Sequence, residues 1–173
     1  MASPEVLTVS TRVGDALRAA GETLAVAESC TGGLVASRVT DVAGSSDYFE
    51  RGFVTYANRA KQAALGVSRE ALDAHGAVSA EVAAELAAGA RDVAGTDWGL
   101  ATTGIAGPGG GTPEKPVGTA FVGVARAAPW GSGDSTVDVR RHGFEGDRLA
   151  VKAAVAETAL STLLEHLEAA AVD

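Results

Sequence analysis

The chain has 173 residues, of which 46% are hydrophobic and only 5% aromatic, and its formal net charge is −8 at pH 7. This length suits one domain over residues 1–173 with a real core, and the acidic balance excludes a general nucleic-acid surface, which needs a basic stripe. An apolar run of membrane-spanning length and a signal-peptide pattern are both missing from the sequence, so we expect a cytoplasmic protein that does not bind membranes.

The first part of the chain predicts a helix, a buried strand and a second helix. Apolar residues recur at three- and four-residue steps across residues 4–20, which indicates an amphipathic helix. Residues 23–27 are continuously apolar, as in a strand buried on both faces, and residues 34–42 resume a helical pattern. Residues 28–33 therefore form a strand-to-helix turn, whose free backbone amides are able to hold an anion.

A second strand follows a Gly-Ser-Ser turn at residues 44–46. The apolar run at residues 49–56 predicts this strand, and Asn58 and Lys61 open the next helical pattern. A strand of roughly eight residues spans about 26 Å, so a serine of the turn meets the Lys61 amine only if the turn or the strand end folds back. Two further helices are predicted at residues 68–75 and 79–93, capped by Ser68 and Ser79.

The second half of the chain adds strands around a long loop. Residues 97–103 predict a strand, and the glycine- and proline-rich loop at residues 104–118 has the length of a functional or disordered segment. Residues 117–125 predict an antiparallel return strand, and residues 137–142 predict an edge strand. A long helix from Asp147 onward should pack beside the first helix. The expected fold is α/β, a three-layer α/β/α sandwich with a mixed, mostly buried sheet, and its glycine-marked turns should converge on one cleft.

Serine, lysine and cysteine are the candidate reactive residues. A Ser-Lys pair is favoured over a Ser-His-Asp triad, because no histidine lies beside a glycine-rich turn. Lys61 is either a base whose pKa a closed cleft lowers or an exposed lysine in a first helical turn. Cys30, just before a helix, is either a reactive thiolate or a small core residue. The sequence has no metal-ligand spacing and no cofactor motif, so we expect neither a metal nor a cofactor.

Five ordered motifs between about residues 23 and 148 resemble the CinA C-terminal domain family. They are Ala27-Glu28-Ser29-Cys30-Thr31-Gly32-Gly33, then Gly44-Ser45-Ser46 with Tyr56-Ala57-Asn58 and Lys61, then Gly76-Ala77-Val78-Ser79, Thr103-Gly104-Ile105-Ala106-Gly107-Pro108 and Lys115-Pro116-Val117-Gly118. The resemblance implies the stand-alone form, since the molybdopterin-binding-like N-terminal domain of full-length CinA is not in this sequence. It also implies an amidohydrolase of pyridine nucleotide salvage, which converts nicotinamide mononucleotide to nicotinate mononucleotide and ammonia.

The resemblance further implies residue roles. Ser46 would be the nucleophile and Lys61 its base, with Tyr56 and Thr103 as supporting hydroxyls. A homodimer or larger homo-oligomer is also implied, and the alternative function is a non-catalytic nucleotide-binding or regulatory module on the same fold. The substrate with its 5′-phosphate needs backbone amides and cations, for which the candidates are Ser29, Thr31, Gly32, Gly33, Asn58, Gly104, Gly107, Gly109, Lys115 and Arg148.

Overall fold

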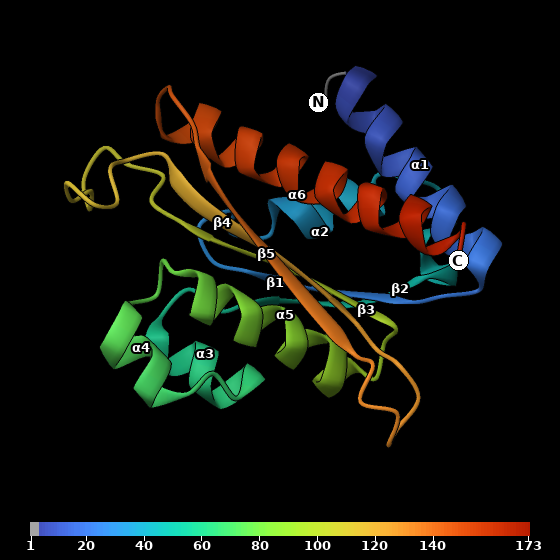
Figure 1. The fold of residues 1–173 in the computed structure, drawn as a ribbon. Helices are drawn as coiled ribbons and strands as arrows, with labels where there is room; N and C mark the ends of the chain where they lie inside the picture. The colour runs from blue at the N-terminus through green and yellow to red at the C-terminus, as the bar shows by residue number, and fades with distance from the viewer. Residues whose placement is uncertain (1–3) are drawn as a thin grey trace.

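A computed structural model describes residues 4–173, with side chains from residue 8 onward, and it contains a five-stranded mixed sheet (Figure 1). The order across the sheet is β2-β1-β3-β4-β5, so β5 is an edge strand, as predicted. β1 runs parallel to β2 and β3, whereas β4 is antiparallel to both β3 and β5. The bounds are β1 (Leu24–Glu28), β2 (Phe49–Val54), β3 (Trp98–Gly104), β4 (Thr119–Arg126) and β5 (Thr136–Gly143).

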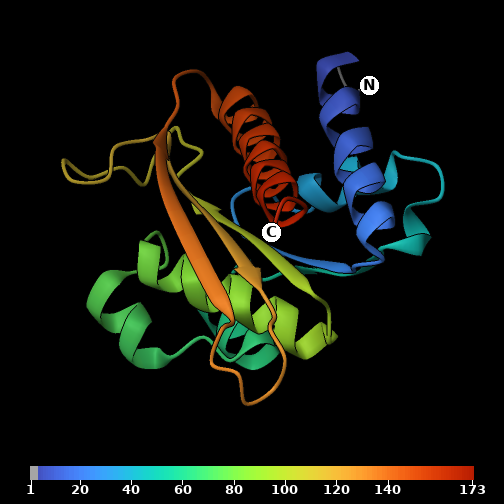
Figure 2. The same cartoon turned by 45° about the vertical axis from the view of Figure 1, so that its right-hand side comes forward.

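Helices cover both faces of the sheet, which confirms the three-layer α/β/α prediction. One layer holds α1 (Pro4–Ala20), α2 (Leu34–Thr40) and α6 (Arg148–Ala170), and the other holds α3 (Asn58–Leu65), α4 (Arg69–His75) and α5 (Ala80–Ala94). Figure 2 shows the blue and red helices above the strands and the green helices below them. The terminal helix α6 packs beside α1, as expected.

Successive side chains of the buried strands contribute alternately to the hydrophobic cores on the two faces of the sheet. Val26 and Leu100 face the α1/α6 layer, and their neighbours Ala27 and Ala101 face α5, because successive strand side chains point to opposite faces. Continuous apolar runs were therefore the correct signal for strands covered on both sides. None of the helices in the described part of the chain combines the length and apolarity needed to cross a membrane.

The predicted helix caps are present. The Ser68 hydroxyl accepts a hydrogen bond from the Ala71 amide, and the Ser79 hydroxyl accepts one from the Val82 amide. Each serine satisfies an amide that the first helical turn leaves unpaired. From its capped start, α5 packs along the sheet against β1, β3 and β4.

The strand predicted at residues 49–56 is shorter in the structure. β2 ends at Val54, which pairs with Glu28 at the carboxyl end of β1. Beyond it, the carbonyl groups of Thr55 and Tyr56 both accept hydrogen bonds from Lys61 instead of continuing the ladder. The strand therefore stops where the chain turns into α3 and brings Lys61 back to the sheet edge.

Candidate active site

Lys61 is the fully buried cation at the carboxyl edge of the sheet, with none of its surface exposed. Its Nζ lies 2.7 Å from the Thr55 carbonyl oxygen, 3.1 Å from the Tyr56 carbonyl oxygen and 3.1 Å from Ser29 Oγ. Burial lowers the pKa of Lys61, since desolvation disfavours the charged ammonium. In its neutral form this amine would keep two N–H groups for the two carbonyls and have a lone pair able to accept the Ser29 hydroxyl proton.

Ser29 stands where β1 gives way to the turn before α2. Its amide donates to the Thr102 carbonyl at 3.1 Å, which continues the parallel pairing of β1 with β3. The preceding Glu28 is 1% exposed, and its carboxylate accepts the amides of Val35 at 2.8 Å and Ala36 at 3.0 Å. The sheet and the start of α2 therefore hold the backbone on both sides of Ser29.

The predicted pairing of Ser46 with Lys61 is not made within this chain. Ser46 is exposed in the short 3-10 helix Ser45–Asp47, which precedes the amino end of β2. Lys61 lies beyond the carboxyl end of the same strand, and six extended residues span about 17 Å. The chain after β2 turns back only to the carboxyl edge of the sheet, and the Gly-Ser-Ser turn stays at the amino end, so the hydroxyl beside Lys61 is that of Ser29. Within one chain, the geometry thus places Ser29, and not Ser46, beside the Lys61 amine.

Tyr56 and Arg148 connect three segments next to this pair. The Tyr56 hydroxyl accepts a hydrogen bond of 3.0 Å from Arg148 Nη2, while Arg148 Nη1 donates to the Gly107 carbonyl at 2.7 Å. The backbone of the same tyrosine holds Lys61. The β2–α3 connection, the glycine-rich loop and the start of α6 therefore meet at one place. The glycine-marked turn at residues 44–46, which was also expected at this cleft, lies at the amino end of β2 instead.

Thr103 is fully buried one residue beyond Thr102, which pairs with Glu28. Its hydroxyl donates to the Ala77 carbonyl at 2.7 Å and so fastens the α4–α5 connection to the end of β3. Its proton is thus engaged in a structural bond.

Thr55, which is 2% exposed, has a buried Oγ1 that finds no hydrogen-bond partner among the described residues. This unengaged hydroxyl follows directly on β2, at the level of Ser29, and sequence reasoning had not singled it out.

The other predicted binding residues fall into two groups. The Thr31 hydroxyl contacts that of Thr102 at 2.7 Å, and Gly32 and Gly33 complete the turn after Ser29. By contrast, Lys115 Nζ donates to the His75 carbonyl at 2.8 Å in a separate hollow. The remaining candidates lie at the start of α3, at the end of β3 and in the exposed loop, namely Asn58, Gly104 and Gly109.

Lys152 is a second residue that sequence reasoning missed. It lies one helical turn after Arg148 on α6, and its Nζ is 3.7 Å from the position that a Cβ on Gly32 would occupy. The four-residue spacing from Arg148 was the signal that could have found it, because such residues share a helix face.

Cys30 is buried against Ala106, Val151 and Val155. Burial raises the pKa of its thiol to about 11. At neutral pH the thiolate is therefore scarce, which favours the interpretation of Cys30 as a core residue. Across the residues that the structure describes, no group of three or more His, Cys, Asp or Glu side chains is arranged to hold a metal ion.

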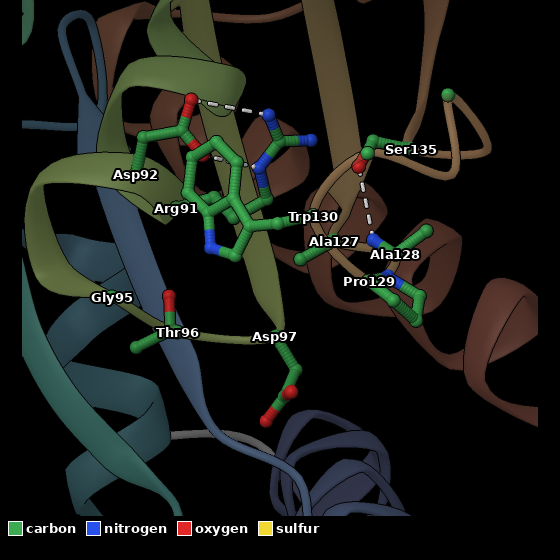
Figure 3. A pocket seen from close by; sticks show the side chains of 12 residues that line it. Arg91, Asp92, Gly95, Thr96, Asp97, Ala127, Ala128, Pro129, Trp130 and Ser135 are labelled. Carbon is green, nitrogen blue, oxygen red and sulfur yellow. Dashed lines mark hydrogen bonds and ion pairs between the residues drawn. The ribbon is translucent and has the colours of Figure 1, made fainter.

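A hollow of about 570 Å³ lies at the opposite edge of the sheet (Figure 3). It is lined by the segments before β3 and after β4 and by Trp130, which is fully exposed. Arg91 in this hollow donates to the Asp92 carboxylate and to the Arg126 carbonyl, so each guanidinium nitrogen already makes one hydrogen bond. It contains none of the predicted site residues.

Comparison with known proteins was made for both sequence and structure. The chain matches the CinA C-terminal domain over residues 6–167. It is 50% identical to the Escherichia coli K12 protein named nicotinamide-nucleotide amidohydrolase PncC, over 96% of this chain and 97% of that protein. A CinA-like protein of Chlorobium luteolum is 57% identical over 85% of this chain but only 34% of its own length. The chain thus spans about a third of the length of such CinA-like relatives.

Solved structures share the fold. The competence/damage inducible protein CihA from Agrobacterium tumefaciens superposes with a TM-score of 0.89 at 36% identity, covering 97% of this chain and 98% of that one. A CinA superfamily protein from Klebsiella pneumoniae 700603 gives a TM-score of 0.86 at 35% identity, covering 94% and 98% of the two chains. Both the order of the elements and their packing are therefore those of known proteins.

Proposed function

Because this chain belongs to the CinA C-terminal domain family, we propose that it is a nicotinamide-nucleotide amidohydrolase acting in pyridine nucleotide salvage. It converts nicotinamide mononucleotide and water to nicotinate mononucleotide and ammonia. The 50% identity to the E. coli PncC protein over nearly the whole chain supports the reaction. The observation that carries the mechanism is the buried Lys61 amine in hydrogen-bonding contact with Ser29.

The first half of the proposed reaction forms an acyl-enzyme. Ser29 Oγ attacks the carboxamide carbon while its proton passes to the neutral Lys61 amine. The resulting ammonium donates to the Thr55 and Tyr56 carbonyls and returns one proton to the departing nitrogen. The C–N bond breaks, ammonia leaves, and the nicotinoyl group remains as an ester on Ser29.

The second half reverses these roles with water. Lys61, neutral again, removes a proton from a water molecule that attacks the ester carbon. The C–O bond to Ser29 breaks, the serine oxygen regains a proton, and the carboxylic acid product is released. The pyridinium ring assists both steps, because its positive charge withdraws electrons from the carbonyl and favours the neutral form of the nearby amine.

Tyr56 and Thr103 have supporting roles in this proposal. Tyr56 contributes its carbonyl to Lys61 and its hydroxyl to the contact with Arg148, so it joins the base to the mouth of the site. Thr103 positions the neighbouring segment, because its proton is engaged by Ala77. A cytoplasmic location and a homodimer or larger homo-oligomer complete the proposal.

The reaction is tested by incubating the pure protein with nicotinamide mononucleotide, with and without a chelator. We expect stoichiometric ammonia and a product one mass unit heavier, unaffected by the chelator. Nucleotide binding without ammonia release would instead favour the alternative, a non-catalytic nucleotide-binding or regulatory module. Loss of activity with the chelator would contradict the metal-free mechanism.

Cys30 should be dispensable. With the pKa of its thiol raised to about 11, the thiolate fraction at pH 7 is on the order of 100-fold below that of an ordinary cysteine. We expect iodoacetamide at pH 7 to leave ammonia release intact, and Cys30→Ala to retain most of kcat. Rapid inactivation by the reagent, absent in Cys30→Ala, would support a thiol nucleophile and contradict the Ser29 assignment.

A further inference from the structure

A hollow of about 430 Å³ adjoins the turn that carries Ser29. Residues 31–34, Ser37, Leu149 and Lys152 line it, so its walls are neutral apart from one lysine. The protein as a whole carries a net charge of −8. Because no carboxylate lines this hollow, Lys152 gives it a local positive charge that attracts an anion, although the molecule as a whole is acidic.

Lys152 differs from the other two lysines, because its ammonium makes no hydrogen bond to any of the described residues. Lys61 donates to backbone carbonyls and contacts Ser29, and Lys115 donates to the His75 carbonyl. Within the described part of the chain, no hydrogen bond or ion pair engages the Lys152 ammonium. A half-buried ammonium that makes no hydrogen bond has three N–H donors available to a ligand.

The backbone opposite Lys152 is glycine. Gly32 and Gly33 both adopt left-handed conformations, with φ of 59° and 103°, which residues with side chains rarely take. The absence of a Cβ on Gly32 leaves its backbone open toward the Lys152 Nζ. The Glu28 carboxylate already accepts the amides of Val35 and Ala36 in the first turn of α2, so these two amides are not open to an anion.

We propose that this hollow holds the 5′-phosphate of the mononucleotide, with Lys152 as its principal counter-charge and the Ser37 hydroxyl as a further donor. The proposal rests on the function proposed above. Gly32 comes three residues after Ser29, at most about 11 Å of chain, so a mononucleotide reaches from one to the other. Arg148, one turn before Lys152 on α6, stands between the hollow and Tyr56.

The competing location is the hollow that contains Lys115, which sequence reasoning had favoured. There the lysine already donates to the His75 carbonyl, and the Glu81 side chain shares the lining. A phosphate would have to displace the hydrogen bond from Lys115 to the His75 carbonyl. It would also be repelled by the Glu81 carboxylate, because like charges repel at close range. Lys115→Met is therefore a matched control for Lys152→Met.

The first experiment compares steady-state kinetics for nicotinamide mononucleotide and for nicotinamide riboside, which lacks the phosphate. We expect Lys152→Met to raise KM for the nucleotide by about tenfold to 100-fold, as loss of a charge-assisted contact does, with little change in kcat. Its KM for the riboside should stay at the wild-type value, and Lys115→Met should change neither. An unchanged nucleotide KM in Lys152→Met, or an equal rise for both substrates, overturns the proposal.

A second experiment separates this proposal from the reaction itself. Calorimetric titration with ribose 5-phosphate needs no turnover, so it tests the subsite even if the wild type releases no ammonia. We expect binding by the wild type and by Lys115→Met, and at least tenfold weaker binding by Lys152→Met, whose fold is checked by circular dichroism. Equal binding by all three proteins, or none by the wild type, overturns the subsite whatever the activity.

Discussion

Ser29→Ala is expected to lower kcat for ammonia release by a factor on the order of 10⁴ or more, because it removes the oxygen that forms the acyl-enzyme. The substitution removes one side-chain oxygen from a residue that is 8% exposed. The contacts that hold the turn do not use this oxygen, because the Ser29 amide donates to the Thr102 carbonyl and the Glu28 carboxylate accepts the Val35 amide. The fold should therefore survive. The measurement is single-turnover ammonia release, with thermal unfolding of the same preparation as the check on folding.

Ser46→Ala is the matched control for that experiment. The Ser46 side chain is exposed at the amino end of β2, far from Lys61, so we expect kcat within about twofold of the wild type, as for other surface substitutions. The reverse result, an inactive Ser46→Ala beside an active Ser29→Ala, would contradict the proposed role of Ser29. It would require Ser46 to enter the site from another molecule or in another conformation.

Lys61→Met is expected to lower kcat by a similar factor, since Ser29 then has no group to take its proton. Methionine fills most of the same volume, and substrate binding should remain, so KM should change far less than kcat. Lys61→Arg provides the control, because it keeps a positive charge that cannot act as a base near neutral pH. Substantial activity in Lys61→Arg would show that the cation, and not the base, is what the site needs.

The pH dependence follows from the same residue. Lys61 acts as a base only when neutral, and burial lowers its pKa from the ordinary value of about 10.4. Below that lowered pKa, kcat/KM should rise about tenfold per pH unit, and above it the profile should level off. A rising limb that persists to pH 11 in the wild type would point to an unperturbed lysine, or to the Cys30 thiol, whose pKa is about 11.

Much of the fold was predictable because it depends on local patterns. The caps at Ser68 and Ser79 follow from hydroxyl groups placed before helical runs, and both are observed. The apolar strand beginning at Leu24 could only be stable between two helical layers, which the structure shows. The unusual buried Lys61 was also recognisable as a candidate, since few lysines are available in this chain.

The partner of Lys61 was not predictable in the same way. A strand pattern states that Ser46 and Lys61 flank β2, but the extended strand holds the two ends apart. Ser29, distant in sequence, reaches Lys61 because β1 lies beside β2 in parallel register, so the two strands finish at the same edge. Strand order is a property of the packed sheet and leaves no mark in either segment alone.

The proposed anion site also depends partly on local sequence and partly on tertiary packing. The glycines after Ser29 predicted an open turn, and that turn exists, with Gly32 and Gly33 in left-handed conformations. Composition and periodicity thus indicated most of the elements, the three-layer arrangement and Lys61 as a candidate. Only tertiary packing decided which of them meet, because contacts between segments far apart in the chain depend on the register of β1 and on the placement of α6, which carries Lys152 to that turn.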